Sequence, residues 1–136
     1  MKKSIALFVI VIVLSLALTA CGAGNAPSTN LKVDFTDFVF TPNTFVIPAG
    51  QEITLTATNS GAVIHEFVIM KLGTTVGDDF GDEDEENIYW EVEVEPGNSA
   101  TVTFTAPAEA GEYQLVCGTE GHFVAGMVGS LTVAAP

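Results

Sequence analysis

The chain has 136 residues, of which 48% are hydrophobic and nine are Phe, so it is long and apolar enough to form one domain with a hydrophobic core. Its charge is one-sided: Lys and Arg total four against seventeen Asp and Glu, for a formal net charge of −13 at pH 7. Binding to nucleic acid requires clustered cations, so this composition argues against nucleic acid as a partner and favours a basic protein.

The N-terminal segment has the features of an export signal. Lys2 and Lys3 precede an apolar run over 5–18, which is short for a membrane-spanning helix of about 20 apolar residues. The tetrapeptide LTAC that ends at Cys21 resembles the lipobox of bacterial lipoproteins, and this resemblance implies cleavage before Cys21 and lipidation of that residue. The alternative is an ordinary signal peptide followed by an incidental Cys.

Three parts of the chain are predicted from this pattern. They are a lipoprotein signal peptide over 1–20, a flexible tether of small and polar residues over 21–30, and a folded domain over 31–136. Several acyl chains would hold the exported protein on a cell membrane, facing the periplasm or the cell exterior. Cys117 would then have no partner for a disulfide, and a free thiol in an oxidising compartment is a liability unless a metal occupies it.

From residue 31 onward, β-branched and aromatic residues alternate with polar ones, and turn signals separate the runs. In the segment 89–96, for example, Trp90, Val92 and Val94 alternate with three Glu residues. This pattern predicts an all-β, antiparallel Greek-key sandwich or barrel forming a single domain after the signal peptide. Strands are predicted over 32–40, 44–48, 52–59, 65–72, 89–96, 99–107, 112–117 and 129–134.

An acidic segment, 73–87, interrupts the strand pattern and is predicted to be an exposed insertion with the one candidate helix near 78–86. It is interpreted either as a solvated loop that keeps the protein soluble or as a steering surface for a basic redox partner. A calcium loop is a weaker third interpretation, because Asn87 stands where such a loop needs Gly and a strand pattern follows. The seven acidic residues are Asp78, Asp79, Asp82, Glu83, Asp84, Glu85 and Glu86.

Four residues stand in a pattern typical of a copper site. Cys117, His122 and Met127 follow the spacing C-x4-H-x4-M directly before the last predicted strand, and His65 begins a strand far upstream. Two imidazoles, one thiolate and an axial thioether are the ligands of a type 1 (blue) copper site, whereas structural zinc sites use several Cys or His and no Met. Each residue alone is usually a core or surface residue, so the prediction depends on the combination.

Nearly all of the segment 31–133 resembles the plastocyanin–azurin cupredoxins. The resemblance is carried by FVFTPNTFVIPAGQEITLTATNSG, by HEFVI and by GEYQLVCGTEGHFVAGMVGSLTV, and the loop spacing is nearest to that of the auracyanins. It implies one copper ion per chain, bound in plane by His65, Cys117 and His122 and capped by Met127. It also implies that the edge of His122 is the electron portal, with an apolar docking surface around it. The candidates for that surface are Phe123, Val124 and Ala125.

Two departures from the family pattern concern this site. Glu66 stands where the family commonly has an Asn that ties the two ligand segments together. The loop 118–121 lacks the aromatic residue and the Pro of many relatives, and it contains Glu120. A carboxylate near the ion favours Cu(II), so we expect Glu120 to lower the reduction potential.

The function predicted from these features is single-electron transfer between membrane or periplasmic redox partners, such as a basic c-type cytochrome or a membrane oxidase or reductase. No enzyme is predicted, because the chain has no GxSxG or HExxH motif and only two His, too few for the further copper of an oxidase or nitrite reductase. One alternative is a lipoprotein for copper delivery or storage, although such proteins tend to use several Met or paired Cys. Another is a cupredoxin-like domain that has lost its metal.

Overall fold

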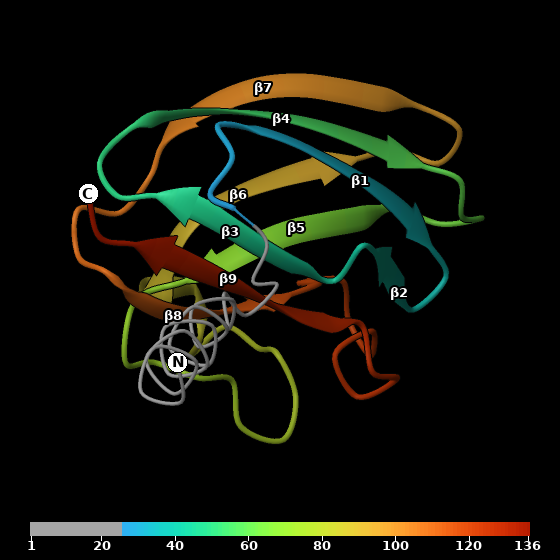
Figure 1. The fold of residues 1–136 in the computed structure, drawn as a ribbon. Helices are drawn as coiled ribbons and strands as arrows, with labels where there is room; N and C mark the ends of the chain where they lie inside the picture. The colour runs from blue at the N-terminus through green and yellow to red at the C-terminus, as the bar shows by residue number, and fades with distance from the viewer. Residues whose placement is uncertain (1–25) are drawn as a thin grey trace, which may run out of the picture.

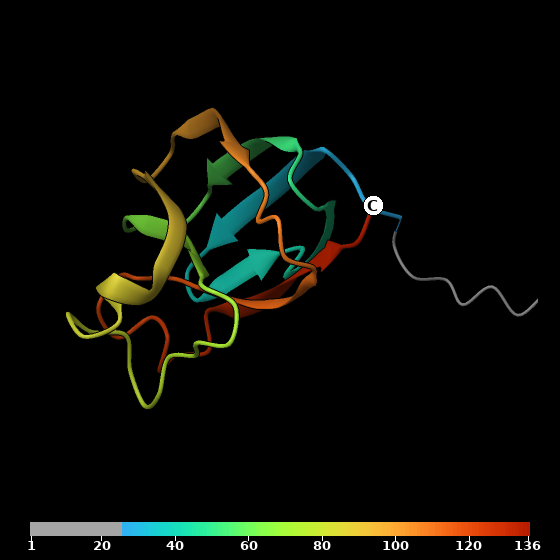
Figure 2. The same cartoon turned by 90° about the vertical axis from the view of Figure 1, so that its left-hand side faces the viewer.

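Alternating apolar and polar side chains form nine strands in residues 26–136, the part of the chain that the computed structural model describes. The strands make two sheets that pack face to face (Figures 1 and 2), one with the order β2-β1-β4-β7 and one with the order β3-β9-β8-β5-β6. The elements are β1 (Asn30–Thr36), β2 (Val39–Thr41), β3 (Thr44–Pro48), β4 (Glu52–Asn59), β5 (His65–Met70), the 3-10 turn η1 (Glu85–Asn87), β6 (Ile88–Val94), β7 (Ser99–Thr105), β8 (Gly111–Val116) and β9 (Val128–Ala134).

The predicted β-sandwich is confirmed, but its strands are not all antiparallel. β1 pairs with β4, and β3 with β9, in parallel, while the other pairs are antiparallel. Alternation of side chains shows which face of a strand is buried and carries no information on the direction of its neighbour. The predicted antiparallel pairing therefore holds for five of the seven strand pairs of the described residues and not for β1–β4 and β3–β9.

The space between the sheets is filled by aromatic and aliphatic side chains. Phe67 on β5 is completely buried, and its ring centroid lies 5.6–6.3 Å from those of Phe35, Phe40 and Phe45. Aromatic pairs at such separations add to the stabilisation that burial provides. Phe35 and Phe40 belong to the opposite sheet and Phe45 to β3 of the same sheet, so this packing holds β5, which begins with His65, against both.

Several strand boundaries differ from the predicted ones, and two of the differences concern the N-terminal part of the domain. The segment 32–40, predicted as one strand, turns at Asp37 and Phe38, where Phe38 has a positive φ of 71°. At the other end, β1 begins at Asn30, and the N–H of Ser28 donates to the carbonyl of Val46 at 2.9 Å, so the last residues of the predicted tether join the folded domain. The predicted signal peptide and Cys21 lie outside the described residues. Within 26–136, no helix has the length and apolar character needed to cross a bilayer.

The acidic segment covers the outer face of the second sheet instead of extending into solvent throughout (Figure 1). An outer cluster of Val68, Met70, Val76 and Val116 is buried there, with Phe80, Ile88 and Phe123 packed against it. This explains why β5 buries both of its faces. Asp84 is also buried, at 8% exposure, and accepts a hydrogen bond from the N–H of Gly81, so it is not part of an exposed steering surface. The candidate helix is the single turn η1.

Candidate metal centre

The predicted ligands come together at one end of the sandwich. The β1–β2 turn, the β4–β5 connection and the loop between β8 and β9 lie at the right-hand end in Figure 1, opposite the C-terminus. His65 is the first residue of β5, Cys117 follows β8, Met127 precedes β9, and His122 lies in the loop between them. His65, Cys117 and Met127 are completely buried, and His122 is 7% exposed, so only a small part of the expected portal reaches solvent.

Three ligand atoms converge on a common point. Nδ1 of His65 lies 3.1 Å from Nδ1 of His122, and Sγ of Cys117 lies 3.9 Å and 3.4 Å from these two nitrogens. A first-row metal that binds imidazole at about 2.0 Å and thiolate at about 2.3 Å in a trigonal plane sets such separations at roughly 3.5–3.7 Å. One thiolate with two imidazoles and a neighbouring thioether favours copper. The residues therefore fit the predicted metal.

Backbone hydrogen bonds close the loop that carries three of the ligands. The N–H of Cys117 donates to the carbonyl of Met127 at 3.1 Å, and the N–H of Met127 donates to the carbonyl of His122 at 3.0 Å. Gly121 and Gly126 have φ values of 77° and 96°, a region that L side chains rarely adopt. These hydrogen bonds and turns fix the conformation of the loop that carries the three ligands.

A second set of hydrogen bonds connects this loop to the residues on either side of His65. Thr119 Oγ1 donates to the carbonyl of Ile64 at 3.1 Å, and the N–H of Glu66 donates to Sγ of Cys117 at 3.4 Å. Asn59 Nδ2 donates to the carbonyls of Val63 and Val94, both at 2.8 Å. Substitution of Glu for the usual Asn therefore leaves the two ligand segments joined, through Thr119 and through a backbone N–H.

The β1–β2 turn contacts both imidazoles, which the sequence analysis did not predict. Asp37 Oδ1 lies 3.2 Å from Nε2 of His65, and the ring of Phe38 packs edge-on against His122 with centroids 5.1 Å apart. One signal was present in the sequence: Val33 and Phe35 occupy odd positions of the apolar alternation and Phe40 an even one, which agrees with a break in the strand between them. Nothing in the sequence indicated which side chains that break would face.

Burial and the neighbouring His65 favour the neutral form of the His122 imidazole. Burial lowers the pKa of His122, and His65 lowers it further, while Asp37 acts in the opposite direction. A lowered pKa keeps the imidazole neutral, which is the form that ligates. The N–H of Ala62 is the main cause that lowers the pKa of Asp37; partial desolvation opposes it, and the hydrogen bond with His65 adds to the lowering.

The three predicted docking residues differ in exposure. Val124 is 65% exposed and Ala125 is exposed, but Phe123 is half-buried and packs against the outer cluster. Two further apolar side chains near the ligands are exposed: Phe38 at 45% and Val63 at 44%. The apolar surface at this end therefore includes residues from the β1–β2 turn and the β4–β5 connection.

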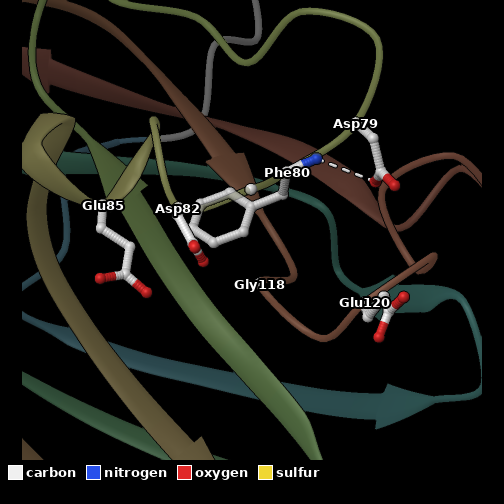
Figure 3. A pocket seen from close by; sticks show the side chains of 7 residues that line it. Asp79, Phe80, Asp82, Glu85, Gly118 and Glu120 are labelled. Carbon is white, nitrogen blue, oxygen red and sulfur yellow. Dashed lines mark hydrogen bonds between the residues drawn. The ribbon is translucent and has the colours of Figure 1, made fainter.

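Part of the acidic segment lies beside the ligand loop. An acidic pocket of about 350 Å³ separates the two (Figure 3) and is lined by Asp79, Phe80, Gly81, Asp82, Glu85, Gly118 and Glu120. Among residues 26–136, the only His, Cys, Asp or Glu side chains that gather closely enough to hold a metal are His65, Cys117 and His122. The described residues therefore do not support the calcium loop.

Comparisons with known proteins agree with this geometry. A family model described as a cupredoxin-like domain matches residues 5–133. The dithionite-reduced auracyanin of the photosynthetic bacterium Roseiflexus castenholzii is 32% identical, with a TM-score of 0.67, over 80% of this chain and 99% of that one. Auracyanin A of Chloroflexus aurantiacus, described as a blue copper protein, is 27% identical, with a TM-score of 0.63, over 80% of this chain and all of its own.

A more distant likeness shows the fold alone. The multicopper oxidase mgLAC is 17% identical, with a TM-score of 0.55, over 78% of this chain and 38% of its own length.

His65, Cys117, His122 and Met127 are arranged as a type 1 copper site. The family model covers nearly all of the described domain, and the chain belongs to the cupredoxin-like family.

Proposed function

We propose that this protein is a type 1 copper electron carrier that shuttles single electrons between membrane or periplasmic redox partners. The observation that carries the proposal is the convergence of two imidazole nitrogens and one thiol sulfur within 4.8 Å of one another, all buried. Bound there, copper would supply a one-electron Cu(II)/Cu(I) couple. Every ligand is already positioned by strands and by a closed loop, so little has to move when the charge changes.

The surface around the site suits brief contact with another protein. Phe38, Val63 and Val124 present exposed apolar side chains close to the buried ligands. Small apolar contacts of this kind are typical of weak, transient redox encounters. The acidic segment beside them would attract a basic partner such as a c-type cytochrome and orient it before contact. A membrane oxidase or reductase with a basic docking face would satisfy the same chemistry.

The orientation of β1 supports an anchored protein whose copper end faces outward. β1 runs from Asn30, paired with Thr54, to the end of the sheet where Phe35 pairs with Asn59, close to the ligands. An anchor at Cys21 would hold the opposite end. We therefore propose that the protein is exported and attached by lipid to a cell membrane, with its copper end available to partners in the periplasm or outside the cell.

An absorption spectrum of the purified full chain with cupric salt tests the proposed function. We expect an intense thiolate-to-copper band in the visible range that disappears on reduction and returns on reoxidation. Cys117→Ser should abolish the band because the oxygen cannot supply the thiolate, while the fold, followed by circular dichroism, stays intact. A protein that remains colourless with cupric salt would contradict the proposal. Copper that binds tightly but does not cycle would favour the delivery or storage alternative.

A further inference from the structure

A carboxylate outside the predicted ligand set contacts the ring of one ligand. Asp37 Oδ1 lies 3.2 Å from Nε2 of His65 and accepts the N–H of Ala62 at 3.0 Å. Asp37 is 42% exposed, whereas the ring of His65 is completely buried. The carboxylate of the β1–β2 turn thus contacts the ligand ring of His65 and also joins that turn to the segment before His65.

The contact determines which nitrogen of His65 is free to bind a metal. Nδ1 of His65 faces Nδ1 of His122 and Sγ of Cys117, so it is the ligating atom. Neutral imidazole carries its proton on one nitrogen only, and a carboxylate at Nε2 accepts a hydrogen bond only if the proton is there. Histidines that bind metals commonly donate their second N–H to a carboxylate, which fixes the tautomer and the ring orientation.

We propose that Asp37 is a positioning residue of the copper centre, which holds His65 in its Nε2–H tautomer and places a negative charge one imidazole ring away from the ion. The proposal rests on the proposed function. The hydrogen bond preorganises the ligand and so contributes to copper affinity. The charge makes Cu(II) more favourable than Cu(I), and so lowers the reduction potential.

The surrounding backbone leaves space for this pair. A Cβ added at Gly61 would lie 2.5 Å from Oδ1 of Asp37 and 2.7 Å from Nε2 of His65, closer than real Cβ atoms approach. A side chain at this position would therefore displace the carboxylate or the ring. Gly61 in the β4–β5 connection thereby leaves the space in which the carboxylate and the ring meet.

Asp34 provides a matched control for Asp37. It lies three residues earlier, on β1, and its carboxylate accepts a hydrogen bond from the hydroxyl of Ser60 in the same β4–β5 connection. Among the described residues, no hydrogen bond joins Asp34 to His65. Asp34→Asn therefore removes one carboxylate charge and weakens one tie to this connection while leaving the ligand's partner in place.

The test compares Asp37→Asn, Asp37→Ala and Asp34→Asn in the full chain with three measurements. Nitrogen-15 NMR of the metal-free protein reports the tautomer of His65. Competition with a chelator reports copper affinity, and voltammetry reports the potential. We expect Asp37→Ala to lose the Nε2–H signal and to lower copper affinity by about 10- to 100-fold. Asp37→Asn keeps an acceptor oxygen, so it should retain the tautomer and most of the affinity while its potential rises. Asp34→Asn should leave all three readouts near those of the unchanged protein.

Two results would overturn the proposal. One is an Nε2–H signal and a copper affinity that survive in Asp37→Ala; the other is an equal rise in potential in Asp37→Asn and Asp34→Asn. The NMR measurement needs no copper, so it tests the role of Asp37 even if the unchanged protein shows no thiolate-to-copper band. Failure of the proposed function and failure of this inference are therefore distinguishable.

Discussion

Glu120 lies within the ligand loop, between Cys117 and His122, and its exposed side chain lines the acidic pocket (Figure 3). Asp37 supplies the second carboxylate near the ligands, but it contacts one of them directly. The two residues carry the same charge in different surroundings. Both carboxylates are exposed, so ions should screen the effect of each on the reduction potential.

Glu120→Gln should raise the reduction potential, since it removes a negative charge that favours Cu(II). Exposed charges interact by less than about 1 kcal/mol in water, so the rise should be at most about 40 mV. Voltammetry at low ionic strength measures it, and the shift should shrink in high salt. Glu112→Gln, at an exposed position on β8, is the control. No upward shift, or a downward one, would contradict the electrostatic explanation.

At the level of elements, the pairing of β5 with β6 brings like charges together. Glu66 lies directly opposite Glu93, and Glu91 is two residues farther along the same strand. Burial is the main cause that raises the pKa of Glu66, and Glu91 and Glu93 raise it further. Like charges opposite each other destabilise a strand pair. The family pattern has an uncharged residue here, so this chain carries an electrostatic cost beside its first ligand.

Glu66→Gln should therefore stabilise the metal-free fold at neutral pH. A folded-state pKa raised above the ordinary value of 4.5 means that ionisation opposes folding at higher pH, and that this penalty disappears once the pH falls below the ordinary value. The gain in free energy of unfolding should be less than about 1 kcal/mol, because the side chain is partly exposed. Thermal melts between pH 4 and pH 8 measure it; a gain that does not shrink at low pH would show that charge is not its cause.

For the whole molecule, the formal net charge of −13 predicts how the protein meets its partners. Part of this charge, in the acidic segment, lies near the ligand end, whereas Glu52 at the start of β4 and Glu109 and Glu112 near the start of β8 lie at the other end of their strands. An uneven field orients a charged partner as well as attracting it. Buried Asp84 belongs to the internal structure of the segment and should be left unchanged in charge variants.

Electron transfer to a basic c-type cytochrome should slow as salt is added, because ions screen the attraction between exposed charges beyond about 8 Å at physiological ionic strength. Stopped-flow rates over a range of salt concentrations give the slope. Replacing Asp78, Asp79 and Asp82 by amides should flatten that slope more than replacing Glu52, Glu109 and Glu112, which removes the same charge from the opposite end. Equal slopes for the two variants would mean that the acidic segment only adds to solubility.

Much of the site could be predicted because three of its ligands lie close together in the chain. Cys117, His122 and Met127 share one loop between two strands, so their spacing alone brings them to the same end of the sandwich. The chemistry of these ligands with His65 then identifies the metal. The buried face of most strands was equally predictable, because an extended chain places alternate side chains on opposite faces.

Other features depend on contacts between segments that are remote in the chain. Asp37 meets His65 across 28 residues. The acidic segment buries Val68, Met70 and its own Asp84, and two strand pairs run in parallel. Alternation along one strand indicates that one of its faces is covered. It does not indicate which segment covers that face or in which direction the adjacent strand runs. Those depend on how the connections between strands run in three dimensions, where the free energy comes from packing the whole domain.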